Sequence, residues 1–185
     1  ESDLGMSTTI MKLTNSAYFS LPTRITSIQK AVQFLRLETI RSLVAVDGLF
    51  ELSNARPEIA SQIQKISKES MVIAGLAKKI ALSEGLDEVE VEQAFCCGLL
   101  CRLGCVLLLM NSSNEVNEYL KRLQVNSTTI SATEKTLFGT THSEVGAYLL
   151  GLWGFADSIV EAVLHQHDPS RIGAKSFNAT IAVYV

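Results

Sequence analysis

Prolines and aromatic residues are few in this sequence. Its 185 residues include only three prolines, and aromatic side chains make up 6% of the chain. Proline is the residue that most strongly interrupts helices, so its scarcity leaves long helices intact. Hydrophobic residues, at 47%, are numerous enough to exclude a disordered chain. Their spacing is helical nearly throughout and no strand–turn–strand pattern is found, so we expect an all-α fold.

Clustered positive charge is also lacking. The chain has 16 lysines and arginines against 19 aspartates and glutamates, which gives a formal net charge of −3. No run of lysine or arginine occurs, whereas proteins that bind duplex DNA usually carry a basic face. We therefore expect no nucleic-acid partner.

Motifs of several enzyme classes are absent. The sequence has no glycine-rich turn followed by Lys-Ser or Lys-Thr, which excludes a P-loop, and no diagnostic Ser/His/Asp order.

The first residues, Glu1–Leu4, lack the features of a secretory signal. The four cysteines fall within residues 96–105 instead of being spread as a disulfide framework. This clustering is typical of a reducing compartment, so we expect a cytoplasmic protein.

One long apolar run stands out. Residues 94–110 are almost wholly apolar and contain one charged residue, Arg102. A membrane-spanning helix needs about 20 apolar residues, and a central arginine is costly in a bilayer. We therefore expect no membrane span, but a buried central helix of a globular domain, from about Glu88 to Met110.

Pairs of capping residues predict where several helices begin. A hydroxyl or carboxylate residue followed three positions later by Glu or Gln satisfies the first backbone N–H groups of a helix. Such pairs are Thr26/Gln29, Asp87/Glu90, Ser131/Glu134 and Thr141/Glu144. Gly85, Gly139 and Gly154 predict helix ends, and Pro57 suits the start of a long helix that reaches about Leu82. These signals predict roughly nine to eleven helices.

The chain is expected to form one domain over residues 1–185. Polar residues interrupt the apolar pattern around residues 53–57, which predicts a boundary between an N-terminal lobe, 1–53, and a second lobe, 54–185. The first residue is not methionine, and the last residues form an apolar stretch without a stop signal. We expect the sequence to be a piece of a longer protein.

The cysteines suit core packing better than a metal site. Cys97, Cys101 and Cys105 are spaced four apart and share one helix face. On a helix, Cys97 and Cys105 lie about 12 Å apart along the axis. Because zinc holds its sulfur ligands about 2.3 Å away, all three cannot bind one ion.

The three histidines leave two roles open. Imidazoles and a carboxylate are the usual ligands of catalytic metals, and His165 and His167 are followed by Asp168. The segment His165–Pro169 also lies at a predicted helix end, where the helix dipole favours histidine and proline marks the stop. Taken alone, these residues suit either a metal site or a structural helix end.

Four blocks of sequence resemble one protein family. They are Leu13–Phe19 with Ile25–Ile28 and Ala31–Leu35, the segment Gly98–Gly104, the segment His142–Leu150 with Trp153, and Ile159–Val163 ahead of Gln166–Pro169. In this order, and over nearly the whole chain, they resemble the HDOD family, non-catalytic relatives of the HD and HD-GYP metal-dependent phosphohydrolases. The resemblance implies an all-α, multi-helix HD-like bundle with a signalling or regulatory role in bacteria. It also implies protein partners or attached signalling modules and no cofactor, and it leaves room for a small-molecule or nucleotide ligand.

The differences from catalytic HD proteins bear on the chemistry. In those proteins a His-Asp doublet binds a metal that activates water for attack on a phosphoester. The resemblance places six residues of this sequence at metal-site positions: Glu69, Cys101, Arg102, His142, Gln166 and His167. Only His142 and His167 keep a matching ligand, and Arg102 adds positive charge and cannot bind a cation. Because a catalytic metal needs three or more fixed ligands, we expect no bound metal, no catalytic residue and no enzymatic activity.

The alternative is a metal-dependent phosphohydrolase that uses substituted ligands. Its ligands would be Glu69, Cys101, His142, His167 and Asp168. Stoichiometric zinc, manganese or iron bound by these residues would favour this alternative.

The family-signature loop, Asn15-Ser16-Ala17-Tyr18, carries a structural prediction. Asn15 and Ser16 follow a predicted helix end, where backbone groups lack helical partners. Their side chains are therefore expected to bond to local backbone. Tyr18 and Phe19 are expected to anchor the loop to the core.

A second structural prediction concerns Arg102, the only charge in the apolar run. A buried guanidinium without a partner is costly, so it needs a carboxylate or several carbonyls. The resemblance aligns Glu69 with another metal-site position. We therefore expect Glu69 and Arg102 to form a direct ion pair that replaces the metal link between two helices. The alternative is that Arg102 reaches the surface, or bonds to Asp168 or to backbone carbonyls.

Overall fold

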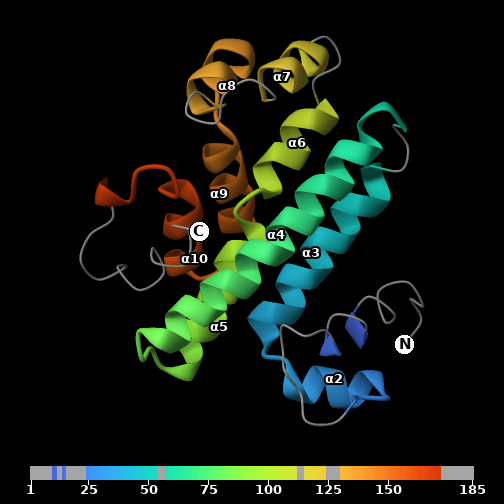
Figure 1. The fold of residues 1–185 in the computed structure, drawn as a ribbon, viewed down its shortest axis with the longest axis vertical. Coiled ribbons are helices and arrows are strands. Elements are labelled where there is room, and N and C mark those ends of the chain that lie inside the picture. The colour runs from blue at the N-terminus through green and yellow to red at the C-terminus, as the bar shows by residue number, and fades with distance from the viewer. Residues whose placement is uncertain are drawn as a thin grey trace.

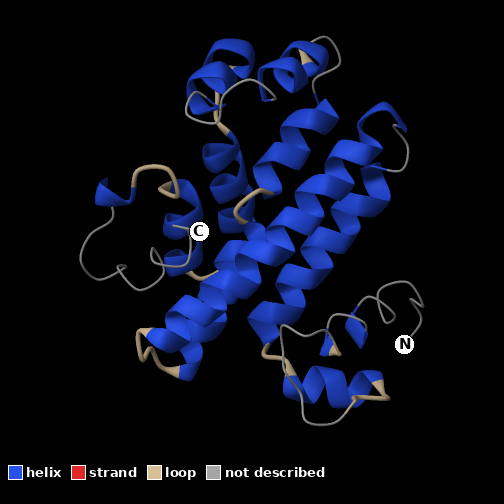
Figure 2. Cartoon of the chain, viewed as in Figure 1, coloured by secondary structure: helices blue, strands red, loops and turns tan. Residues whose placement is uncertain are grey.

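The computed structural model describes residues 10–11, 14–15, 24–53, 57–111, 115–123 and 130–171. Within these ranges every regular element is a helix, which confirms the expected all-α fold (Figure 2). The elements are α2 (Ile28–Phe34), α3 (Leu37–Ser53), α4 (Pro57–Ser83), α5 (Glu88–Leu100), α6 (Leu103–Asn111), α7 (Val116–Leu123), α8 (Ile130–Phe138), α9 (His142–Leu152), α10 (Asp157–Leu164) and the 3-10 helix η2 (Pro169–Arg171). The helix expected near Ser176 lies outside the described residues, and the one expected at Leu4–Thr14 lies mostly outside them.

Three helices, α3, α4 and α5, pack against one another and form the centre of the molecule (Figure 1). α6 follows α5, α9 packs on α6, and α10 packs on α5 and α9. The larger apolar cluster draws its side chains mainly from α4, α5, α6, α9 and α10. A smaller cluster joins α2 and α3 to other residues of α4 and α5. The central helices therefore contribute to both clusters.

The expected central helix is interrupted. A turn at Cys101 and Arg102 separates α5 from α6, so the prediction of one continuous helix is wrong at this point. The carbonyl oxygen of Cys101 accepts a hydrogen bond from Nε2 of Gln166, 2.9 Å away. A backbone acceptor at the interruption therefore has a side-chain partner from another element. The burial was predicted correctly, since most residues of α5 and α6 are buried.

The stretch Glu88–Asn111 would be long and apolar enough to cross a membrane, judged by length and composition alone. In its most apolar window, 78% of the residues are buried inside the fold. Core helices of globular proteins have this property. The structure thus places this stretch in the protein interior, as the sequence predicted.

Two of the four predicted capping pairs are confirmed. Asp87/Glu90 and Thr141/Glu144 form complete capping boxes at the starts of α5 and α9. The prediction for Thr26 is wrong, because the hydroxyl of Ser27 caps α2 by accepting from the Lys30 backbone N–H. The prediction for Ser131/Glu134 is also wrong. α8 already begins at Ile130, and the Glu134 carboxylate is buried against other helices.

Candidate functional site

All six expected metal-site positions come together where α4, the α5–α6 turn, α9 and the turn after α10 meet. Glu69 of α4 contacts Arg102, and Gln166 bonds to the carbonyl of Cys101. Gln166 also donates to the Ser143 hydroxyl at 2.9 Å and to a carbonyl of α10. α10 ends at Leu164, two residues earlier than predicted, and the following turn directs residues 166 and 167 toward this region.

The predicted ion pair between Glu69 and Arg102 is confirmed. The Nη1 atom of Arg102 lies 2.7 Å from Oε2 of Glu69. Each side chain is 38% exposed, and the Lys65 ammonium lies 3.9 Å from the same carboxylate. The pair is therefore partly solvated, and Arg102 reaches from the apolar helices to the surface. The expected ion pair and the alternative of an arginine that reaches the surface thus occur together.

Because water screens this pair, removing it is expected to have a small effect. We predict that Glu69→Ala lowers the free energy of unfolding by about 0.5–1 kcal/mol, against about 3–5 kcal/mol for a fully buried pair. Urea denaturation of Glu69→Ala, Arg102→Met and the double variant gives the coupling energy between the two side chains. A coupling above about 2 kcal/mol would contradict the partial exposure of the pair.

His142 lies at the start of α9 and is only 4% exposed. Its Nδ1 atom is 2.7 Å from Oε2 of Glu134, and its backbone N–H donates to the same oxygen at 2.9 Å. The Tyr119 hydroxyl donates to the other oxygen of this carboxylate. Burial alone would raise the pKa of Glu134, but the hydrogen bonds and charge of His142 and the bond from Tyr119 hold it below its usual value.

The Glu134 contact fixes which nitrogen of His142 carries a proton. The carboxylate accepts a hydrogen bond from Nδ1–H of His142, so Nε2 is the ring nitrogen that faces His167. His167 Nε2 lies 2.9 Å from this atom, so one of the two nitrogens donates a hydrogen bond to the other. Burial lowers the pKa of His167, and so does the charge of His142. Tyr119, Glu134, His142 and His167 thus form a hydrogen-bonded chain from the core toward the surface.

The metal implied by the HD resemblance does not fit these residues. Of the expected ligand positions, only His142 and His167 present imidazole nitrogens, and these bond to each other. The Cys101 thiol donates to the carbonyl of Gly98, and burial raises its pKa to about 12, so it is a poor thiolate ligand. Glu69 is engaged by Arg102, whose charge opposes a cation. This donor set falls short of the three fixed ligands that a catalytic metal needs.

A second group of ligand-type atoms lies deeper in the same region. Donor atoms of Cys105, Glu134 and His142 lie within 4.8 Å of one another, and all three residues are buried. Burial raises the pKa of Cys105, and the nearby Glu134 charge raises it further. Both carboxylate oxygens already accept hydrogen bonds from Tyr119 and His142. These bonds satisfy the carboxylate without an ion.

Sequence reasoning missed the roles of Tyr119 and Glu134. Glu134 had the spacing of a capping residue, three positions after Ser131, and this local pattern hid its tertiary role. The burial of Glu134 becomes visible only in the fold, so no local sequence signal identified its pairing with His142.

The predicted role of Asn15 is confirmed. Its side-chain amide donates to the carbonyls of Met11 at 2.9 Å and Ile25 at 2.8 Å, and its Oδ1 accepts from the Ile25 N–H. The side chain therefore ties the helix end at Asn15 to the backbone of Ile25, ten residues later. Ser16, Ala17, Tyr18 and Phe19 lie outside the described residues.

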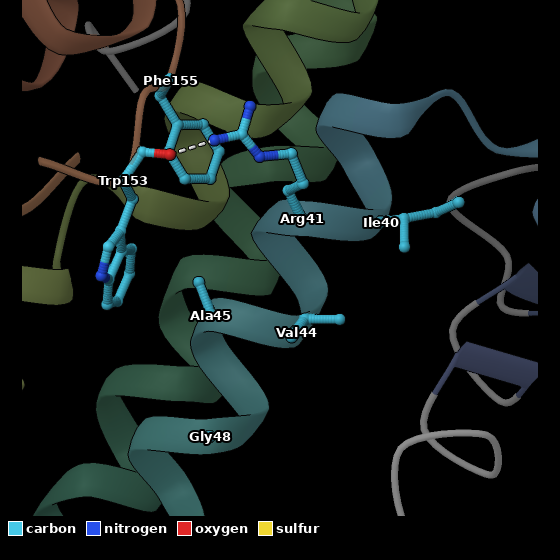
Figure 3. Close-up of a pocket in the computed structure, with 7 residues that line it drawn as sticks. All are labelled: Ile40, Arg41, Val44, Ala45, Gly48, Trp153 and Phe155. Atoms are coloured by element: carbon cyan, nitrogen blue, oxygen red, sulfur yellow. Dashed lines mark hydrogen bonds between the residues drawn. The ribbon is translucent and has the colours of Figure 1, made fainter. Parts of the chain in front are cut away.

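An apolar groove lies between α3 and the turn that joins α9 to α10 (Figure 3). Its volume is about 550 Å³, and it is lined by Ile40, Arg41, Val44, Ala45, Gly48, Trp153 and Phe155. Arg41 donates to the backbone carbonyls of Trp153 and Gly154, and its guanidinium lies 4.5 Å from the centre of the Phe155 ring. The guanidinium therefore ties α3 to the α9–α10 turn. Sequence reasoning did not identify this groove.

Comparison with known proteins agrees with this architecture. Among solved structures, an HDOD domain protein of unknown function from Geobacter sulfurreducens has a TM-score of 0.75 and 25% identity, over 99% of this chain and 61% of that one. A provisionally named phosphohydrolase from Shewanella amazonensis has a TM-score of 0.73 and 23% identity, over 98% and 63%. A provisionally named signal transduction protein from Marinobacter aquaeolei has a TM-score of 0.67 and 18% identity, over 98% and 41%.

This chain spans less than two thirds of the length of each of these three proteins. The family model described as the HDOD domain matches residues 1–169, which is most of the sequence. The match includes the Asn15 loop, the α5–α6 turn and the two histidines that bond to each other. The chain therefore belongs to the HDOD family.

Proposed function

We propose that this domain is a non-catalytic regulatory module, which binds protein partners or neighbouring signalling modules in bacterial signal transduction. The observation that carries the proposal is that residues at the positions which the resemblance aligns with metal ligands bond directly to one another. Glu69 and Arg102 form an ion pair, and His142 bonds to His167. These contacts link α4 to the α5–α6 turn, and α9 to the turn after α10, without an ion. We propose a cytoplasmic location and no cofactor.

The apolar groove supports a binding role. Tryptophan and arginine carry much of the binding energy in protein interfaces, and Trp153 and Arg41 both line the groove. Trp153 is 39% exposed, so part of its indole is accessible. A regulatory domain needs accessible surface of this kind to recognise another molecule.

The second candidate is a phosphohydrolase with substituted ligands. The observation that favours it is the proximity of the two imidazoles. Their Nε2 atoms lie 2.9 Å apart, and two nitrogens that bind one tetrahedral zinc lie roughly 3.3 Å apart, so a small movement would let both bind one cation. The charge of Arg102 and the engaged Glu69 carboxylate weigh against it. A hydrolase would need a third fixed ligand and an open position for water.

Metal analysis and a hydrolysis assay separate the two candidates. We expect the purified domain to contain no stoichiometric zinc, manganese or iron, and to show no turnover of bis-p-nitrophenyl phosphate when these metals are added. The physical reason is that two imidazoles alone hold a metal too weakly to activate water. Turnover that disappears on chelation and in His142→Ala, but persists in the control His165→Ala, would establish the hydrolase instead.

A further inference from the structure

A second cavity lies away from the metal-site positions, where the α2–α3 junction meets α4 and α5. Its volume is about 130 Å³. It is lined by Phe34, Leu35, Arg36, Thr39, Lys78, Glu88, Val91, Glu92 and Phe95. Three separate stretches of sequence therefore contribute to its walls, and a ligand here would contact the α2–α3 junction and both long helices at once.

The polar wall of this cavity carries two positive and two negative side chains. The Arg36 guanidinium bonds to Glu88 at 2.8 Å and to Glu92 at 3.0 Å. The Thr39 hydroxyl donates to Glu92 at 2.6 Å. Lys78, on α4, interacts electrostatically with Glu92. The four charges sum to zero, so a ligand with a net charge would leave that charge uncompensated.

These charges are partly withdrawn from water. Burial lowers the pKa of Lys78, and the charge of Glu92 partly offsets this effect. Burial also raises the pKa of Glu92, and the hydrogen bond from Thr39 and the charge of Arg36 partly offset this rise. An added carboxylate near Lys78 and an added ammonium near Glu92 would therefore be attracted more strongly than at an open surface.

The remaining wall is apolar. Leu35, Val91 and Phe95 are nearly fully buried and form the floor on one side. The cavity is smaller than the roughly 300–1,000 Å³ of pockets that take drug-sized ligands. Its size and charge pattern disfavour a nucleotide, which is larger and multiply negative.

We propose that this cavity binds a small zwitterion with an apolar side chain, such as a free aliphatic amino acid. The ligand carboxylate pairs with Lys78, and the ligand ammonium lies against Glu92 and Glu88. The aliphatic side chain rests on the floor formed by Val91 and Phe95. Occupancy would add contacts among the α2–α3 junction, α4 and α5 and so give the domain a metabolite-sensing site. This site is separate from the HD positions and does not depend on the function proposed above.

Calorimetric titration of the domain tests this proposal with three matched probes: leucine, isoamylamine, which lacks the carboxylate, and 4-methylpentanoate, which lacks the ammonium. We expect leucine to bind at least about tenfold more tightly than either single-charge analogue, because each charge-assisted contact adds affinity. Lys78→Met and Glu92→Gln should each weaken leucine binding at least about tenfold. Lys79→Met, an exposed lysine one position along α4, is the control and should stay within about twofold.

Three results would overturn the proposal. Absence of leucine, valine and methionine binding at millimolar concentration in the wild-type domain would exclude the site. Equal binding of leucine and 4-methylpentanoate would mean that the ammonium is not recognised. Unchanged leucine binding in a folded Lys78→Met variant, checked by circular dichroism, would place the ligand elsewhere.

Discussion

Replacing Gly104 with alanine is expected to destabilise the domain by about 3 kcal/mol or more, the upper range for an overpacked core. A Cβ at Gly104 would lie 1.9 Å from the carbonyl oxygen of His142 and 2.9 Å from the backbone nitrogen of Gly146. Both neighbours are backbone atoms, so a side-chain rotation cannot relieve the clash. α6 and α9 would have to move apart, which would open the apolar cluster between them.

Gly151→Ala is the matched control for this experiment. A Cβ at Gly151, which lies in α9, would meet nothing within 4 Å, so alanine is expected to stabilise this helix by about 0.5–1 kcal/mol. Thermal and urea denaturation of both variants measure the difference. A loss below about 1 kcal/mol in Gly104→Ala would contradict the close crossing of α6 and α9.

The close contact between α6 and α9 also determines the position of His142. His142 is the first residue of α9, and its carbonyl is the group that touches Gly104. Cys105 follows Gly104 and lies beside the Glu134–His142 pair. A shift of α9 would therefore move the imidazole of His142 away from His167. We expect Gly104→Ala to disturb both the fold and the candidate site.

Local sequence signals predicted much of the helical framework. The apolar period and Pro57 gave the extent of α4, within one residue of its end at Ser83. Asp87/Glu90 and Thr141/Glu144 marked helix starts because their bonds involve residues only three positions apart. Gly85 has a φ of 73°, which glycine adopts readily, so the glycine in the sequence also predicted this helix end.

Tertiary contacts account for what the sequence did not predict. The apolar run at residues 94–110 gave no sign of the turn at Cys101–Arg102, where Gln166, from a distant segment, supplies a hydrogen bond. Glu134 fitted a capping pattern, but its bonds to Tyr119 and His142 determine its position. Such partners are far apart in the chain, and local propensity carries no information about them.

The candidate site was predicted in part. The pairing of Glu69 with Arg102 followed from the cost of an unpaired guanidinium together with the resemblance. Its degree of burial did not follow, because a long arginine side chain can lie along apolar helices and still reach solvent. The second cavity was not predicted either, since Arg36, Lys78 and Glu92 come from the α2–α3 junction, α4 and α5, which only the fold brings together.

Removal of the Glu134 carboxylate is expected to cost about 3–5 kcal/mol, the range for breaking a buried ion pair by removing one partner. Glu134 is fully buried, and Glu134→Ala would leave the Tyr119 hydroxyl and two N–H groups of His142 without this acceptor. Glu134→Gln keeps the size but replaces one acceptor with a donor, so it should also destabilise. Glu84→Gln, at an exposed residue, is the control and should change stability by less than about 0.5 kcal/mol.

The pH dependence of stability gives an independent check on Glu134. Its pKa in the folded protein is lowered from a usual value of 4.5. The unfolded chain therefore binds this proton more readily, so the carboxylate stabilises the fold above pH 4.5, and this contribution is lost as the pH falls through the lower folded pKa. Urea midpoints between neutral pH and pH 3 should therefore fall more steeply for the wild-type domain than for Glu134→Gln. Parallel profiles would mean that the Glu134 carboxylate does not hold its charge when buried beside His142.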